Sequence, residues 1–349
     1  AGLLLVVALG NAAGCRASNA AAVVEHPGDR PARVQRREFR PELNGRWIGN
    51  GISYGPHRDG QDPTKGIHPS AAEFREDLAL LAPRWRMLRV YASGDPIETF
   101  LRVIDEDQLD IKVMLGAWIN TETRETPAGD VEAIPEAVAA NRAEVEAAIR
   151  LANAYPNIVI AVSVGNETQV SWSSHKVRPE VLIRYIRQVR NSVSVPVTTA
   201  DDFTYWLLPE SRAVADEIDF LVTHVYAMWW GRTREQALSF TKEKFAAVRA
   251  AHPQHLVVLG EAGWATRRRT EGAEEAKLMA GVASESEQEK FVCDYLAWTT
   301  ANRIPNFYFE AFDENWKGDD HPDGVEKHWG LFRADRTPKP ALRCVPLWE

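Results

Sequence analysis

The feature that most constrains the fold of this chain is a repeated alternation of short apolar segments with amphipathic ones, which begins near residue 46. The apolar segments are rich in Val, Ile and Leu and show little polar alternation, as is typical of parallel strands buried on both faces. This pattern predicts eight strands, which span 47–55, 86–93, 111–118, 157–167, 195–201, 218–226, 255–264 and 306–314.

Helical segments lie between the predicted strands. Their apolar residues recur every three or four positions, which is the spacing of one helix face. We expect helices at 69–83, 96–108, 132–155, 178–193, 233–251 and 283–302, and a short one near 208–216.

Eight strands with intervening helices predict an α/β protein, a (β/α)8 TIM barrel that forms a single catalytic domain over residues 46–349. The main alternative is a doubly wound open sheet. No glycine-rich phosphate loop follows the first predicted strand, which disfavours the dinucleotide-binding form of that alternative.

The first fifteen residues, AGLLLVVALGNAAGC, contain an apolar run that is shorter than the roughly 20 residues of a transmembrane helix. The run resembles the hydrophobic region of a secretory signal, and the AAGC ending resembles a bacterial lipoprotein cleavage site. We expect residues 1–15 to be a lipoprotein-type signal peptide with a truncated start, and Cys15 to be lipidated; an ordinary signal peptide is the alternative. Residues 16–45 are then a linker, and the protein is expected in the periplasm or cell envelope, attached to the membrane through Cys15.

The formal net charge of −8 gives no indication of a nucleic-acid partner. Export permits a disulfide between Cys293 and Cys344, although two free thiols fit the sequence equally well. The acidic cluster at 319–323 suits calcium, but a solvated loop is the simpler interpretation, and no zinc-like spacing of Cys and His occurs. We therefore expect neither a metal nor an organic cofactor.

Polar and aromatic residues gather at the C-terminal ends of the predicted strands, where TIM-barrel enzymes build their active sites. The fourth strand ends on Asn166 and Glu167, and the seventh ends on Glu261, with Trp264 soon after. The N-terminal strand ends are less polar. The other candidate site residues at the C-terminal ends are Tyr54, Arg89, Tyr91, Trp118, His224, Tyr226, Trp229, Trp230, Glu314 and Lys317.

Glu167 and Glu261 are predicted to face each other across the mouth of the barrel, because their strands lie well apart around the ring. Glycoside hydrolysis requires two opposed carboxyls: one donates a proton to the leaving oxygen, and the other attacks the anomeric carbon or activates water. For a single acid, a structural ion pair, for instance with Arg89, would be the simpler interpretation. The tryptophans offer flat apolar faces that stack on sugar rings, although core packing explains some of them.

Four motifs together resemble glycoside hydrolase family 17, which contains β-1,3-glucanases, licheninases and β-1,3-glucanosyltransferases. They are GISYGPHRDGQDP at the first strand, VGNE at the fourth, GEAGWAT at the seventh, and FEAFDENWK followed by EKHWGLF at the eighth. The first motif looks like the bacterial branch. The resemblance covers residues 46–345 and implies a (β/α)8 barrel and a retaining double displacement on β-1,3-glucan, by hydrolysis, glucanosyl transfer or both.

Carried over to this sequence, the resemblance implies that Glu167 is the general acid/base and that Glu261 is the nucleophile. Asn166 would hold the sugar 2-hydroxyl, and Tyr54 and Tyr226 match family tyrosines near the reacting sugar. An acidic and basic cluster of the family, which binds hydroxyls or orients the catalytic pair, corresponds to Glu314, Lys317 and Glu326.

The sixth strand departs from the plant members of the family, since it reads THVYAMWW where they more often have NVYPY. We expect His224 and the pair Trp229 and Trp230 to reshape the sugar sites for this reason. The expected partner is a β-glucan oligosaccharide or polysaccharide. Two alternatives are a related barrel glycosidase that acts on another β-glycan, and a non-catalytic glycan-binding protein of the envelope.

Overall fold

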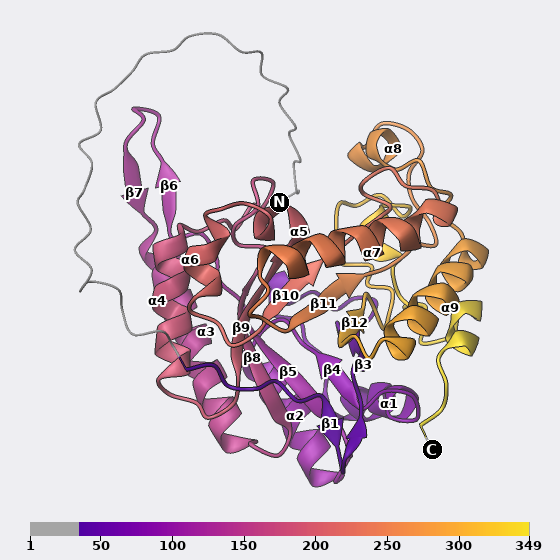
Figure 1. Ribbon diagram of the computed structural model, residues 1–349, viewed down its shortest axis with the longest axis horizontal. Coiled ribbons are helices and arrows are strands. Elements are labelled where there is room, and N and C mark those ends of the chain that lie inside the picture. Colours follow the sequence, from indigo (N-terminus) through magenta and orange to yellow (C-terminus); the bar gives the residue numbers. More distant parts are fainter. Residues whose placement is uncertain (1–34, 349) are drawn as a thin grey trace.

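The computed structural model of the protein describes residues 35–348, and its centre is a closed barrel of eight parallel strands (Figure 1). The strands follow one another around the ring in chain order, and the last pairs with the first. Each overlaps its predicted segment, so the predicted TIM barrel is confirmed. The strands are β3 (Asn50–Ser53), β4 (Met87–Arg89), β5 (Lys112–Ala117), β8 (Val159–Asn166), β9 (Val197–Asp202), β10 (Leu221–His224), β11 (Val257–Ala262) and β12 (Asn306–Tyr308).

The helices surround the barrel (Figure 1), because each presents an apolar face to the outer side of the strands. The six long ones match the predicted segments: α1 (Ala71–Leu81), α2 (Asp95–Glu106), α3 (Pro135–Ala154), α4 (Pro179–Arg190), α7 (Arg234–Ala251) and α9 (Glu285–Ala301). Three are short: α5 (Phe203–Trp206), α6 (Ser211–Ala215) and α8 (Glu274–Leu278). Within residues 35–348, no helix combines the length and the apolar character that crossing a membrane requires.

The N-terminal end of the barrel is closed by residues that the sequence analysis assigned to the linker. The strand β1 (Glu42–Leu43) pairs with β2 (Arg46–Trp47), and the buried ring of Phe39 stacks on Phe220 with 4.4 Å between centroids. The backbone N–H of Arg37 donates to Asp219 Oδ1 at 2.7 Å. The linker prediction is therefore wrong for residues 35–45, because the apolar interior of the barrel needs a cover and this segment supplies it.

The other N-terminal predictions lie outside the described residues. They are the signal peptide at 1–15, the lipidation of Cys15 and the linker over residues 16–34. Export and membrane attachment likewise stay predictions.

The sequence analysis missed a hairpin between β5 and α3. Its strands are β6 (Thr123–Glu125) and β7 (Val131–Ala133), and it projects from the barrel at the end where β5 finishes (Figure 1). Its side chains are mostly exposed, so neither strand has the apolar face by which a buried strand is recognised.

The structure settles the pairing of the two C-terminal cysteines, which the sequence left open. Cys293 on α9 and Cys344 form a disulfide, with their Cα atoms 5.0 Å apart. The bond fastens the last described helix, the 3-10 turn η3 (Pro340–Cys344), to α9.

Candidate active site

The VGNE segment at the end of β8 has an irregular backbone. Gly165 and Glu167 both lie in the left-handed region, with φ of 77° and 49°, and the pairing with β9 shifts register between Ser163 and Asn166. A Cβ on Gly165 would come within 2.9 Å of the side chain of Thr168, so glycine is required there. A glutamate in this conformation costs about 1–2 kcal/mol, and such strained residues cluster at functional sites.

Glu261 ends β11 in a nearly closed environment, with only 6% of its side chain exposed. Its Oε1 accepts hydrogen bonds from Arg89 Nη1 at 2.7 Å and from the Tyr91 hydroxyl at 3.0 Å, and its Oε2 accepts from the Tyr226 hydroxyl at 2.6 Å. Burial alone would raise the pKa of this carboxyl, but His224, Arg89 and the Tyr226 hydroxyl outweigh burial and hold the pKa below its ordinary value. The site therefore keeps Glu261 ionised.

Arg89 connects the strand ends that carry the two glutamates. Besides its ion pair with Glu261, its Nη2 donates to Asn166 Oδ1 at 2.6 Å, and its guanidinium lies over the ring of Tyr91 at 4.5 Å. The structural ion pair considered for Glu261 thus exists. It is one contact among several, however, and among residues 35–348 Glu167 has no arginine partner.

His224 lies between the two glutamates. Its Nδ1 is 3.1 Å from Glu167 Oε1, and its Nε2 is 3.4 Å from Glu261 Oε1. A register shift between β10 and β11 places His224 opposite Glu261. One imidazole ring therefore lies close to both carboxyls, and the structure brings Glu167 and Glu261 together at the C-terminal ends of the strands.

The two glutamates differ in exposure. The side chain of Glu167 is 27% exposed, whereas that of Glu261 is 6% exposed. Glu167 can therefore reach a group in the mouth of the barrel, while Glu261 is held from behind by its donors.

The segment after β12 contributes a second charged group to this end of the barrel. The Nζ of Lys317 lies 2.6 Å from Glu310 Oε2 and 2.8 Å from Glu314 Oε2, and both carboxyls are buried. Burial and the neighbouring Glu314 raise the pKa of Glu310 well above its usual range, although Lys317 opposes them. Glu326 belongs to the same group: burial raises its pKa to about 7, Lys317 opposes the rise, and the carboxylates of Glu167 and Glu261 add to it. Glu326 is therefore electrostatically coupled to both glutamates.

Two predicted sugar contacts are wrong. Tyr54 is 1% exposed and its hydroxyl donates to Asp77 Oδ2 at 2.9 Å, because at this position β3 turns its side chain toward α1 rather than into the mouth. Trp264 is fully buried, and its Nε1 donates to the carbonyl of Val282 at 3.0 Å. Both are core residues.

The paired tryptophans after β10 lie apart from the glutamates. Trp229 is partly buried against the core, and Trp230 is 43% exposed with its ring 5.2 Å from that of Phe203 on α5. Neither has a recorded contact with Glu167 or Glu261 among the described residues. Their predicted role in shaping the sugar sites stays a prediction.

Sequence reasoning missed His175, which lies in the loop between β8 and α4. Its Nε2 is 2.7 Å from the carbonyl oxygen of Asn166, and its ring is 4.5 Å from that of Trp118. Nothing in the sequence marked it, because it is eight positions beyond Glu167 in a loop without periodicity.

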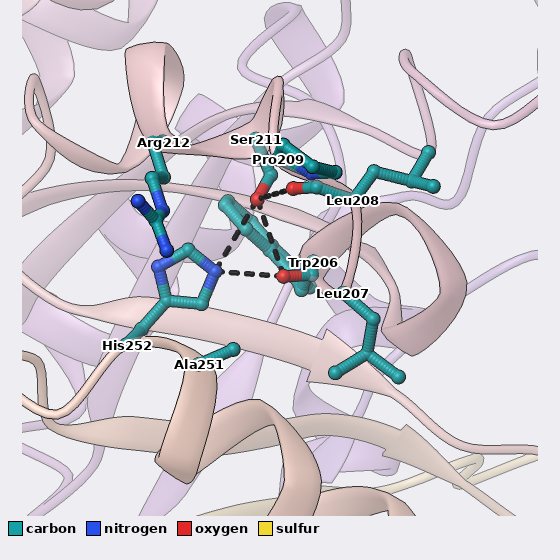
Figure 2. A pocket seen from close by; sticks show the side chains of 8 residues that line it. All are labelled: Trp206, Leu207, Leu208, Pro209, Ser211, Arg212, Ala251 and His252. Atoms are coloured by element: carbon teal, nitrogen blue, oxygen red, sulfur yellow. Dashed lines mark hydrogen bonds between the residues drawn. The ribbon is translucent and has the colours of Figure 1, made fainter.

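A small cavity of about 80 Å³ lies on the outside of the barrel, where α5 and α6 meet the end of α7 (Figure 2). Two of its polar side chains are hydrogen-bonded: His252 Nε2 is 2.7 Å from the carbonyl oxygen of Trp206 and 3.3 Å from Ser211 Oγ. No predicted site residue lines it. The cavity is therefore separate from the strand-end site.

The acidic loop at 319–323 is tied to the segment after β11. Asp319 pairs with Arg269 Nη2 at 2.8 Å, and Asp323 pairs with Arg267 Nη1 at 3.3 Å. The two arginines compensate the negative charge of Asp319 and Asp323, as a bound cation otherwise would. Across residues 35–348, no group of three or more His, Cys, Asp or Glu side chains is arranged to hold a metal ion.

A TIM barrel whose strand ends hold two opposed carboxyls, one buried and one exposed, defines the class of barrel glycoside hydrolases. The family described as "BtgE/BtgC glycoside hydrolase domain" matches residues 51–330. The chain therefore belongs to the BtgE/BtgC glycoside hydrolase family.

Known relatives agree with this assignment. The chain is 31% identical over 290 residues to a glucan 1,3-beta-glucosidase of Arthroderma benhamiae, with 78% of this chain and 85% of the relative covered. A glucan 1,3-beta-glucosidase of Schizosaccharomyces pombe is 29% identical, with 78% and 81% covered.

Solved structures support the resemblance to glycoside hydrolase family 17. An endo-laminarinase from Formosa Hel1_33_131 superposes with a TM-score of 0.72 at 26% identity, covering 84% of this chain and 86% of that one. A family 17 β-1,3-glucanosyltransferase from Rhizomucor miehei gives 0.64 at 26% identity, with 84% and 96% covered. An active-site mutant of the Rhizomucor miehei enzyme is known in complex with laminaritriose.

Proposed function

We propose that this protein is a retaining enzyme that acts on β-1,3-linked glucan by hydrolysis, glucanosyl transfer or both. The observation that carries the proposal is the contrast between two carboxyls joined by one imidazole: Glu261 is buried among donors that favour its ionised form, and Glu167 is open to the mouth. The substrate class rests on the relatives, whose names describe glucan 1,3-beta-glucosidases, an endo-laminarinase and a β-1,3-glucanosyltransferase.

In the first step, Glu261 attacks the anomeric carbon while Glu167 donates its proton to the leaving oxygen, and a covalent glycosyl-enzyme forms. Oε2 of Glu261 is the oxygen better suited to attack, because three groups hold Oε1 (Arg89, Tyr91 and His224), whereas Oε2 accepts only from the Tyr226 hydroxyl among the described residues. In the second step, Glu167 takes a proton from water or from an acceptor sugar hydroxyl, whose oxygen displaces Glu261.

Arg89 also sets the orientation of Asn166. Because the side-chain oxygen of Asn166 accepts from Arg89 Nη2, its amide nitrogen is left to donate. This arrangement suits a contact with the 2-hydroxyl of the reacting sugar, where a hydrogen bond strengthens in the transition state.

Product analysis tests the proposal. Laminarin and laminari-oligosaccharides are expected to be cleaved with a β-configured first product, while cellulose and mannan oligosaccharides stay intact. Products longer than the donor in a time course would identify transfer. If a β-1,4-linked glycan were cleaved and laminarin left untouched, the substrate assignment would be wrong.

Tyr226→Phe is expected to shift the acidic limb of the pH profile upward. The hydroxyl of Tyr226 is one of the groups that lower the pKa of Glu261, and the nucleophile must be ionised to react. Activity is lost as the pH falls through this pKa, so removing the donor raises the pKa and moves the loss to higher pH. We expect kcat/KM to fall by about 10–100-fold at neutral pH, as for the loss of a hydrogen bond to a charged group.

The measurement is the pH dependence of kcat/KM, which reports the free enzyme. Tyr295→Phe is the matched control, because Tyr295 is buried on α9 and its hydroxyl has no hydrogen-bond partner among the described residues. An unchanged acidic limb in Tyr226→Phe would contradict the assignment of Glu261 as the ionised group.

A further inference from the structure

The exposed side of the site near Glu167 carries an aromatic pair. The pair consists of Trp118, which follows β5, and His175, from the loop after β8; their ring centroids are 4.5 Å apart with an interplanar angle of 38°. Both side chains are half-buried. They belong to neighbouring strands of the barrel, because β5 pairs with β8.

Trp118 is held in place by its surroundings. Its backbone N–H donates to Glu144 Oε1 on α3 at 3.1 Å, and its indole Nε1 donates to Asn120 Oδ1 at 3.1 Å. Asn120 is itself fixed by Asn141, which accepts from its N–H at 2.8 Å and donates to its carbonyl at 2.8 Å. The indole N–H therefore needs no hydrogen bond from a ligand. The ring presents a pre-positioned apolar face on which a ligand can stack.

His175 offers a complementary polar atom. Its Nε2 lies 2.7 Å from the carbonyl oxygen of Asn166, and because a carbonyl only accepts, this nitrogen must carry the proton. Burial lowers the pKa of His175, although its bond to Asn166 and the charge of Glu167 oppose this, so the ring is neutral at neutral pH. Its Nδ1 is then an acceptor, and no described residue donates to it.

The position of Trp118 and His175 relative to the two glutamates decides whether they contact the leaving-group sugar or the sugar that becomes attached to the enzyme. The general acid protonates the leaving oxygen, so the leaving group lies on the Glu167 side of the scissile bond. His175 contacts Asn166, the residue adjacent to Glu167, and the charge of Glu167 acts on its ring. Trp118 follows β5 and His175 follows β8, and neither strand is a neighbour of β11, which carries Glu261. An acceptor that resolves the glycosyl-enzyme enters by the path the leaving group used.

We infer that Trp118 and His175 form a subsite for the leaving-group and acceptor sugar, with the indole stacked on the C–H face of a glucosyl unit and His175 Nδ1 accepting from one of its hydroxyls. This inference rests on the proposed β-1,3-glucan activity and deepens it, because a subsite here controls whether a sugar or water completes the reaction. The ligand is a neutral, hydroxylated ring with an apolar face.

The test compares two donors. Laminaritetraose places sugar on the leaving-group side, whereas β-laminaribiosyl fluoride leaves that side empty. In Trp118→Leu, kcat/KM for laminaritetraose is expected to fall about tenfold, which corresponds to about 1.4 kcal/mol, while the value for the fluoride changes less than about twofold. Trp118→Phe keeps a flat ring and should retain most of the laminaritetraose activity. Should the Leu variant fail to fold, His175→Phe provides the test of the subsite.

His175→Phe tests the polar half of the subsite. The phenylalanine ring still packs on Trp118 but has no acceptor nitrogen. Added laminaribiose should therefore be a poorer acceptor and give a smaller fraction of transfer product. Cleavage of laminaritetraose should also fall, relative to cleavage of the fluoride. An equal fall in activity on both donors would mean that His175 only supports Asn166, and would overturn its place in the subsite.

Trp47→Leu is the matched control for Trp118→Leu, because Trp47 is half-buried at the opposite end of the barrel.

Different results would contradict the proposed function and the subsite. Wild-type enzyme that leaves laminaritetraose uncleaved would overturn the proposed function. Cleavage by the wild type with the same ratio of laminaritetraose to fluoride activity in Trp118→Leu would overturn the subsite and leave the proposed function standing.

Discussion

Glu261→Gln is expected to lower kcat on β-1,3-glucan by at least about 10³-fold, because an amide does not act as the nucleophile. Oε1 of Glu261 accepts from Arg89 and Tyr91, and Oε2 accepts from Tyr226, so the wild-type carboxylate is positioned on both oxygens. An amide nitrogen at either position would meet a donor, so the substitution also disturbs the site locally.

The control for this variant is Glu217→Gln. Glu217 is also buried and paired with an arginine, since its Oε1 lies 2.6 Å from Arg187 Nη2, but it precedes β10 at the far end of the barrel. A loss of activity in Glu261→Gln that Glu217→Gln does not share is then specific to the site. Comparable thermal unfolding of the two variants would exclude misfolding as the cause.

Glu261→Gly supplies the stereochemical evidence. Azide fits the space left by the carboxyl and attacks the anomeric carbon directly, so an activated donor should give the α-glycosyl azide, with inverted configuration. Full activity in Glu261→Gln, or a β-configured azide from Glu261→Gly, would remove Glu261 from the nucleophile role.

Glu167→Gln is the second large effect, and its size should depend on the leaving group. With laminari-oligosaccharides, kcat is expected to fall at least about 10³-fold. The leaving sugar needs a proton in the first step, and the attacking water or acceptor sugar needs a base in the second. With β-laminaribiosyl fluoride, whose leaving group needs no proton, kcat/KM should stay within about tenfold of the wild type. The glycosyl-enzyme then accumulates, since its breakdown lacks the general base.

Azide again reports the role. In Glu167→Gly it should accelerate breakdown of the glycosyl-enzyme and yield the β-glycosyl azide, because two displacements preserve configuration. Equal losses with fluoride and oligosaccharide donors would show that Glu167 does not act as the acid. The opposite anomers from the two glycine variants form the sharpest single comparison available in this chain.

Several residues of this site could be predicted from the C-terminal ends of the strands. Asn166, Glu167 and Glu261 were found because apolar runs ended abruptly on polar residues, and the barrel rule placed those ends at one rim. The same rule failed for Tyr54 and Trp264. Strand ends show where the chain emerges but not which way a given side chain turns, and both of these turn into the layer between strands and helices.

The failures outside the strands have a common physical origin. The β6–β7 hairpin, the cover formed by residues 35–47 and the loop that carries His175 have no periodic apolar face, so no pattern marks them. Contacts distant in sequence hold their surroundings, as Asp219 holds Arg37 in the cover, Tyr185 holds Glu122 before the hairpin, and Asp201 holds Gln169 at the start of the loop that carries His175. Such contacts exist only once the barrel has closed.

The sequence by itself determined that this chain builds an eight-stranded barrel and that acidic and aromatic residues emerge at one end of it, because apolar strands and amphipathic helices carry their periods in local sequence. Only the tertiary structure decided which glutamate is buried and which is open. His224, Arg89, Tyr91 and Tyr226 surround Glu261 from the ends of two other strands, β4 and β10. The environment of a carboxyl depends on groups that closure of the ring brings within hydrogen-bonding distance, and no local pattern encodes that distance.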